Sequence, residues 1–349
     1  MSTQKKRNLT IDFLRIFSAI LVVMTHSLAP FAVQNIFYAR LLNRFASVAV
    51  PIFFILSGYS IIYTVKRHPN ISFLDIVKHD LKRLFLPYIT WSLLYFAYLV
   101  LSHSARDYNI RYLITHILYG NMWYHTYFLL IMIIQYPISI MFYKLMQKYS
   151  KLIFMVLLIS PIIVSLVTGI IPINFINRIL WLSPLQWGIY FYIGIWLHEH
   201  NYLEHLSTPI VLTSYIILAI TLPVALFIER LQTNQFIIYL EYYDRLLMTL
   251  ATLIIFYKLG TWIIKILPQL HSPVKFLSSL TYTLYLSHPV ILIIFNRIHF
   301  EPFNARGTFT LFVYFPIVLI SAVVLATILN KSESVLLNFQ TKYATAKKH

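Results

Sequence analysis

The sequence contains no cysteine and few charged residues. Of its 349 residues none is Cys, only 7 are Gly, and 11% are charged. The absence of cysteine excludes disulfides, thiol catalysis and cysteine-ligated metals. With 59% hydrophobic residues, so low a charge content is untypical of a soluble domain. The composition therefore predicts a polytopic membrane protein.

Acidic residues are scarcer than basic ones, 11 against 28, which gives a formal net charge of +17. Placing the N-terminus in the cytoplasm puts seventeen Lys and Arg residues inside and eight outside. This distribution satisfies the positive-inside rule. The excess charge then faces anionic membrane lipid, and nothing in the sequence points to nucleic-acid binding.

Ten apolar runs are long enough to be read as membrane helices. They lie near residues 9–31, 47–65, 85–103, 122–143, 152–171, 184–198, 209–228, 243–264, 276–297 and 308–330. The expected fold is an all-α bundle of about ten transmembrane helices, with both termini in the cytoplasm. Residues 1–8 and 331–349 are predicted to be cytoplasmic tails around a single domain, 9–330.

The first run contains Asp12, Arg15 and His26 among apolar residues. Ionisable residues inside a membrane helix are costly and point to function. Arg15 and His26 are eleven residues apart, about 1,100° of rotation, so they lie within roughly 20° on one helix face and about 16 Å apart in depth. Asp12 is three residues before Arg15, a spacing that allows an ion pair. The alternative is that the three residues only hold helices together.

The second run contains the small pair Ser57-Gly58. Small residues let another helix or an acyl chain approach the backbone, and helix packing alone also explains them. The basic loop that follows ends in Lys82-Arg83, shortly before Pro87, which is expected to begin the third span. Such a cation cluster can hold phosphates, although ordinary positive-inside topology accounts for it equally well.

Aromatic residues open the fourth span: Trp123, Tyr124 and Tyr127 surround His125. Aromatics at this depth are normal interface anchors, whereas His125 can face a polar cavity. The ninth span carries His288 directly before a proline. An imidazole at mid-membrane is expected to face protein and not lipid, and a packed, hydrogen-bonded histidine is the alternative.

The loop that begins His198-Glu199-His200 has the residue types of a metal site. Histidines on a loop do not set zinc geometry by themselves, however, so no metal is expected.

Six of these patterns, taken in order, resemble the type 3 membrane acyltransferases. They are Arg15 with His26, Pro51 to Tyr59, the basic junction before Pro87, Tyr124 to Leu129, Phe191 to Gly194, and Tyr282 to Pro289. The family consists of ten-helix bacterial proteins that O-acylate surface polysaccharides, and the size of this chain is most similar to the exopolysaccharide type, including that of the intercellular adhesin. The chain departs from the family where Asp80 replaces an arginine and where Thr126 and Tyr127 replace two residues of the fourth-span motif.

The resemblance implies transfer of an acetyl or succinyl group from cytoplasmic acyl-CoA, acetyl-CoA or succinyl-CoA, to a hydroxyl of a cell-surface polysaccharide. It also implies a multi-pass protein of the bacterial plasma membrane, with a glycan synthase complex as a further partner. The alternatives are an exporter or flippase of the polysaccharide, or a structural partner of a synthase. No inverted repeat supports the exporter.

The resemblance also assigns roles to residues. His26 is the expected general base, because a neutral imidazole accepts a hydroxyl proton near pH 7. Arg15 is expected to hold the donor's carbonyl or phosphate region and to offset developing charge, with Asp12 orienting it. The donor contacts are assigned to Lys82, Arg83, Ser57 and Gly58, and the acceptor contacts to Trp123, Tyr124, His125, Tyr127 and His288.

Overall fold

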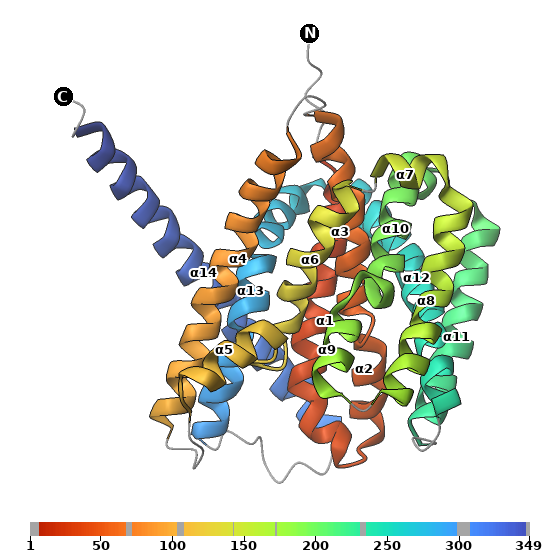
Figure 1. Cartoon of the computed structure of the whole chain (residues 1–349), viewed down its shortest axis with the longest axis horizontal. Helices are drawn as coiled ribbons and strands as arrows, with labels where there is room; N and C mark the ends of the chain where they lie inside the picture. Colours follow the sequence, from red (N-terminus) through yellow and green to blue (C-terminus); the bar gives the residue numbers. More distant parts are fainter. Residues whose placement is uncertain are drawn as a thin grey trace. The chain divides into compact units, whose positions relative to one another are not determined.

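The computed structural model of the chain is helical (Figure 1). It describes residues 7–67, 72–102, 108–141, 143–171, 173–230, 235–298 and 308–346, among which no strand occurs. The α-helices are α1 (Leu9–Val33), α2 (Phe37–Ala46), α3 (Ala49–Arg67), α4 (Phe73–Leu101), α5 (Ile110–Tyr119), α6 (Tyr127–Met141), α7 (Tyr143–Lys148), α8 (Ser150–Ile170), α9 (Asn174–Leu182), α10 (Pro184–Glu199), α11 (Thr208–Arg230), α12 (Gln235–Ile266), α13 (His271–Arg297) and α14 (Thr308–Ala346). Two 3-10 turns, η1 (Tyr202–His205) and η2 (Pro268–Leu270), join neighbouring helices.

Eight segments of the described chain are long and apolar enough to cross a membrane. They are Leu9–Val33, Phe37–Tyr63, Lys82–Leu101, Ser150–Ile170, Thr208–Ile228, Leu240–Ile266, Pro268–Arg297 and Phe312–Lys331. The predicted fourth and sixth spans correspond to α6 and α10, which have 15 and 16 residues. The all-α polytopic fold is thus confirmed. The cytoplasmic location of the termini stays a prediction.

The chain divides into two compact units. The first comprises Met1–Ala49, Val211–Leu226 and Met248–His349, and the second comprises Val50–Ile210 and Phe227–Leu247. The predicted catalytic residues of α1 and the ninth-span His288 belong to the first unit. The predicted donor residues and the aromatic residues before α6 belong to the second.

In the first unit α1 packs against α2, α13 and α14. Ring contacts bring α12 onto α1, because Phe17 stacks on Phe256 with ring centroids 3.7 Å apart. Asn43 of α2 donates a hydrogen bond to the carbonyl of Thr25 at 2.6 Å. These contacts hold the part of α1 that carries His26.

In the second unit α10 lies beside α8 and also packs against α6 (Figure 1). It approaches α3 closely at two glycines. A Cβ added at Gly58 would overlap the carbonyl oxygen of Phe191, and one added at Gly194 would overlap that of Ile55. Glycine is therefore required at both positions for the two backbones to come so near.

Helix α4 begins earlier than expected. Ser72 caps it by accepting a hydrogen bond from the backbone N–H of Asp75 at 3.1 Å. The expectation that Pro87 begins the third span is wrong, since Pro87 lies inside α4. Membrane helices tolerate such a proline because neighbouring groups satisfy the backbone carbonyl that it leaves without a donor.

Candidate active site

The first turn of α1 places a carboxylate inside the protein. The Asn8 side chain caps the helix by accepting hydrogen bonds from the backbone N–H groups of Thr10 and Ile11, at 3.0 and 3.2 Å. Asp12 follows in the first turn and is only 1% exposed. A carboxylate there is favoured by the positive end of the helix dipole.

Three donors surround Asp12. Arg15 donates from Nη1 to Oδ1 at 3.2 Å, Ser278 of α13 donates to the same oxygen at 2.8 Å, and Arg7 donates to Oδ2. A second nitrogen of Arg7 bonds the backbone carbonyl of Lys275 at 3.3 Å. The carboxylate therefore links the start of α1 to α13 and restrains the Arg15 guanidinium. Hydrogen bonds to charged groups of this kind contribute about 1.5–3 kcal/mol each.

His26 lies against a second imidazole. Its ring centroid is 5.3 Å from that of His288 on α13, and the ring planes are inclined by 21°. Helix α1 runs without interruption through Arg15 and His26, so the depth between their Cα atoms is that of eleven helical residues, about 16 Å. In the first unit, His26 therefore contacts His288, which was predicted to bind the acceptor, and Arg15 lies on the same helix as His26.

A proline sets the orientation of the His288 ring. In an α-helix the N–H of residue 289 would bond the carbonyl of Tyr285, but Pro289 has no N–H. The Nδ1 atom of His288 takes its place and donates to that carbonyl at 2.7 Å. Because a carbonyl oxygen only accepts, Nδ1 carries a proton, and in the neutral ring Nε2 holds the lone pair. His288 is fully buried.

In the second unit, aromatic residues gather where α4 meets the segment before α6. Trp123 stacks on Tyr95 with centroids 5.0 Å apart, and His125 meets the same Tyr95 ring edge-on at 5.4 Å. Tyr124 lies 5.6 Å from His125 and is 44% exposed. The structure therefore brings Trp123, Tyr124 and His125 together around Tyr95.

Tyr127 belongs to a different group of rings. It contacts Trp181 of α9, with centroids 5.1 Å apart. The Arg178 guanidinium lies 4.5 Å above the Trp181 ring and donates from Nε to the carbonyl of Tyr119 at 2.8 Å. Burial lowers the pKa of Arg178, but a guanidinium remains protonated in proteins. Tyr127 thus packs beside a cation and apart from the Tyr95 group.

The residues predicted to bind the donor lie at the surface of α4 or within α3. Lys82 and Arg83 are exposed on α4. Ser57 donates to the carbonyl of Phe53 at 2.8 Å within its own helix, and Gly58 faces α10. The structure therefore gives Gly58 a packing function, while the role of all four residues in donor binding stays a prediction.

Within the described ranges, no group of three or more His, Cys, Asp or Glu residues is arranged to hold a metal ion. The predicted histidine-rich loop is helical at its start, because His198 and Glu199 are the last residues of α10, and both make other contacts. His198 lies edge-on to Tyr59 and Tyr63, both at 4.7 Å, and Glu199 forms an ion pair with Lys66 at 3.0 Å.

Fold and site together define a polytopic helical membrane protein that holds an anchored arginine and paired imidazoles on two packed helices. Residues 8–331 match the model of the acyltransferase 3 family, described as an acyltransferase domain. The chain belongs to this family, as the sequence motifs indicated, and is a membrane acyltransferase that transfers groups other than aminoacyl groups. Comparisons with curated proteins and with solved structures returned no match.

Sequence reasoning missed three contacting residues. Arg7 was counted with the basic N-terminal flank. Its contact with Asp12, five residues later, requires the Arg7 side chain to lie along the first turn of α1. Ser278 had no distinguishing signal, because a serine in an apolar helix is common. Tyr95 lies one helical turn after Trp91, and this aromatic spacing was the available hint.

Proposed function

We propose that the protein transfers an acetyl or succinyl group from cytoplasmic acyl-CoA to a hydroxyl of a surface polysaccharide at the bacterial plasma membrane. The observation that carries this proposal is the arrangement on α1 and α13, where His26 stacks on His288 and Asp12 restrains Arg15. Acyl transfer to a hydroxyl needs a general base near the acceptor and a group that positions the donor. These residues can supply both.

His26 acts as the general base. Its neutral imidazole takes the proton of the acceptor hydroxyl while the hydroxyl oxygen attacks the thioester carbonyl carbon. The tetrahedral intermediate then collapses, the C–S bond breaks, and the CoA thiolate leaves with the proton that His26 returns. An ester replaces a thioester, and the base is regenerated. His288 supports His26 through the stacked ring, and its hydrogen bond to Tyr285 keeps that ring in one orientation.

We propose that Arg15 contacts the polar arm of the donor, and its depth on α1 supports this role. About 16 Å of helix separates the Cα atoms of Arg15 and His26, and the Arg15 guanidinium is bonded to Asp12, which lies a further three residues from His26. Helical side chains also lean toward the N-terminus, so the guanidinium points away from His26. Of the two roles expected for Arg15, the phosphate or pantetheine contact is therefore favoured over stabilisation of the oxyanion.

In the Tyr95 group of the second unit, Tyr124 is the ring that we propose for the sugar acceptor. Tyr124 is partly exposed, whereas His125 and Tyr95 are buried. An apolar ring face beside polar ring edges suits a pyranose, which has one apolar face and hydroxyls at its rim.

Ester content of the surface polymer tests the proposed function. NMR of the polymer from a wild-type strain and from a deletion strain should show acyl esters only in the wild type, with polymer present on both cell surfaces. Retention of a normally esterified polymer inside the deletion strain would contradict acyl transfer and support export.

A further inference from the structure

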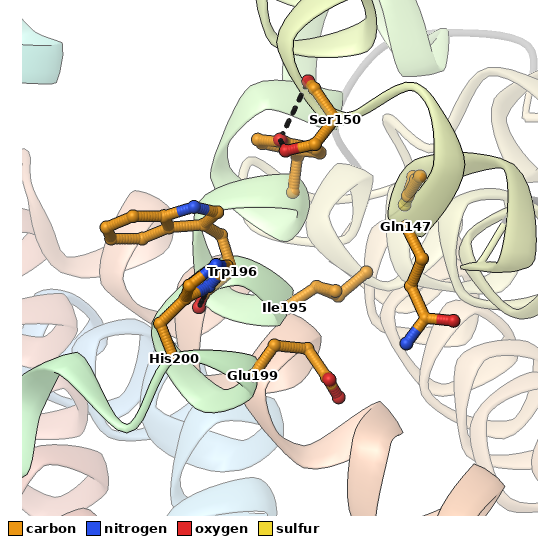
Figure 2. Close-up of a pocket in the computed structure, with 8 residues that line it drawn as sticks. Gln147, Ser150, Ile195, Trp196, Glu199 and His200 are labelled. Atoms are coloured by element: carbon orange, nitrogen blue, oxygen red, sulfur yellow. Dashed lines mark hydrogen bonds between the residues drawn. The ribbon is translucent and has the colours of Figure 1, made fainter.

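A cavity of about 270 Å³ lies at the C-terminal end of α10, in the second unit (Figure 2). Its walls come from α7, the start of α8 and the last turns of α10, and include Gln147, Ser150, Trp196, Glu199 and His200. Under the predicted topology this end of α10 faces the cytoplasm. The proposed mechanism uses none of these residues, although the donor has to arrive from that side.

The polar atoms of the cavity are mainly acceptors. The Oε1 atom of Glu199 accepts a hydrogen bond from the Tyr143 hydroxyl at 2.7 Å and forms an ion pair with Lys66 at 3.0 Å. Among the described residues both partners bind Oε1, which leaves Oε2 open to a ligand. Burial raises the pKa of Glu199. The hydrogen bonds from Tyr143 and Lys66, together with the Lys66 charge, lower it by more, so the pKa lies below its ordinary value. Glu199 is therefore an anionic acceptor at neutral pH.

Two other side chains add acceptors. His200 donates from Nδ1 to the carbonyl of Trp196 at 2.9 Å, so Nε2 of the neutral ring holds a lone pair. Gln147 donates from Nε2 to the Tyr143 hydroxyl at 2.8 Å, and its Oε1 remains an acceptor. Figure 2 shows Gln147, from α7, and Glu199, from α10, at the same cavity. A ligand with N–H donors is favoured here.

Flat rings form another wall. The Trp196 indole stacks on His200 with centroids 4.7 Å apart and planes inclined by 28° (Figure 2). A planar base with an exocyclic amino group would stack on this wall and donate to the acceptors opposite it. The volume is slightly smaller than that of typical ligand sites, about 300–1,000 Å³, and so suits one ring system of a larger ligand.

Exposed lysines lie on two of the same helices. Lys144, Lys148 and Lys151 are exposed on α7 and α8, beside Gln147 and Ser150 in the sequence. Exposed lysines bind phosphate as mobile point charges. Acceptors, a flat ring and neighbouring lysines together match a nucleotide, whereas a lipid headgroup amine would leave the flat wall unused.

We propose that this cavity binds the adenine end of the acyl-CoA donor, with phosphates held by the lysines of α7 and α8. This inference rests on the proposed function, because it requires acyl-CoA to be the donor. It adds an adenine contact that Lys82 and Arg83 do not provide.

Equilibrium binding of acetyl-CoA and of adenosine 3′,5′-bisphosphate to the purified full chain tests the inference. Loss of a base-stacking ring weakens binding by about 5-fold to 150-fold, and this is the effect expected of Trp196→Ala for both ligands. Trp196→Phe keeps a ring and should recover most of the affinity. Trp262→Ala is the matched control, since Trp262 is 60% exposed on α12 and should change neither affinity.

The outcomes separate this inference from the proposed function. If the wild-type chain binds acetyl-CoA and Trp196→Ala binds it equally well, the adenine site is wrong while the proposed function stands. If co-purifying phosphatidylethanolamine is then lost from that variant, the cavity holds a lipid headgroup. If the wild-type chain neither binds acetyl-CoA nor transfers its acetyl group, both proposals fail.

Photolabelling of the wild-type chain needs no variant and covers the case in which Trp196→Ala does not fold. An 8-azidoadenine analogue of CoA should label residues 146–151 or 192–200, and excess adenosine 3′,5′-bisphosphate should suppress the labelling. Labelling confined to residues 78–83 would overturn the assignment.

Discussion

Asp12 is the buried carboxylate on which Arg7, Arg15 and Ser278 converge. Its energetic importance comes from burial, because a guanidinium that loses its partner in a membrane helix is costly to keep. Arg15 is 36% exposed, so packing alone does not fix its side chain. The position of Arg15 is therefore set by Asp12 and not by its own helix alone.

Asp12→Asn removes the negative charge while keeping the shape of the side chain. We expect the KM for acyl-CoA to rise about 10-fold to 100-fold, the value of one charge-assisted hydrogen bond, while kcat changes less. Asp75→Asn is the control, because Asp75 is also a first-turn acid but is exposed on α4. An unchanged KM together with a lowered kcat would place Arg15 at the reacting carbonyl instead.

At the scale of helices, the backbones of α3 and α10 approach one another closely at Gly58 and Gly194. Gly194→Ala would drive a Cβ into the Ile55 carbonyl. Overpacking of this kind costs about 1–3 kcal/mol, so the melting temperature in detergent should fall. Gly188→Ala, on the same helix, is the control. The Cβ added at Gly188 would meet the flexible Leu157 side chain at 3.1 Å. Equal melting temperatures of the two variants would argue against a tight α3–α10 contact.

Helix α13 offers a second test at this scale. Pro289→Ala restores a backbone N–H that competes with His288 for the Tyr285 carbonyl, so the imidazole loses its fixed orientation. We expect kcat to fall by at least about tenfold, since misplacement of supporting groups is costly in catalysis. Helix stability should not fall, because proline inside a helix is unfavourable. Pro223→Ala makes the same backbone change on a different helix, α11. If both variants keep wild-type kcat, the orienting role of Pro289 is wrong.

Much of the helix pattern follows from the sequence, because apolar runs in a membrane have few alternatives to a helix. The shared face of Arg15 and His26 follows from helix geometry alone. The short helices α2, α5 and α9 were not expected, since ten or fewer residues give little periodic signal. The pairing of His26 with His288 joins residues far apart in the sequence, and only tertiary packing of α1 on α13 reveals it.

On the scale of the whole molecule, polar contacts in the second unit connect loops predicted to lie on the same side of the membrane. Lys66 and Tyr143 both contact Glu199. Lys66 and Glu199 lie in predicted cytoplasmic loops, and Tyr143 is the last residue of the predicted fourth span, at its cytoplasmic end. Arg178 bonds the carbonyls of Tyr119 and Gly120, in segments predicted to be external. These pairings agree with the predicted alternation of loops.

Single cysteines test the orientation cleanly, because the native chain has none. Leu74 and Ile110 suit this purpose, since each lies near the start of a helix and they are 63% and 68% exposed. A membrane-impermeant thiol reagent should label Ile110→Cys in intact cells and should label Leu74→Cys only after lysis. The reverse pattern would invert the topology and remove the cytoplasmic donor site.

The central claim is that His26 removes the proton of the acceptor hydroxyl, and the ester content of the surface polymer tests it most directly. His26→Gln should be expressed in the deletion strain at wild-type abundance in the membrane. Loss of a positioned general base costs about 10²–10⁴-fold in rate, so NMR should find no esters on that polymer. His288→Gln should cause a smaller loss. Wild-type ester content with His26→Gln at equal abundance would contradict the account.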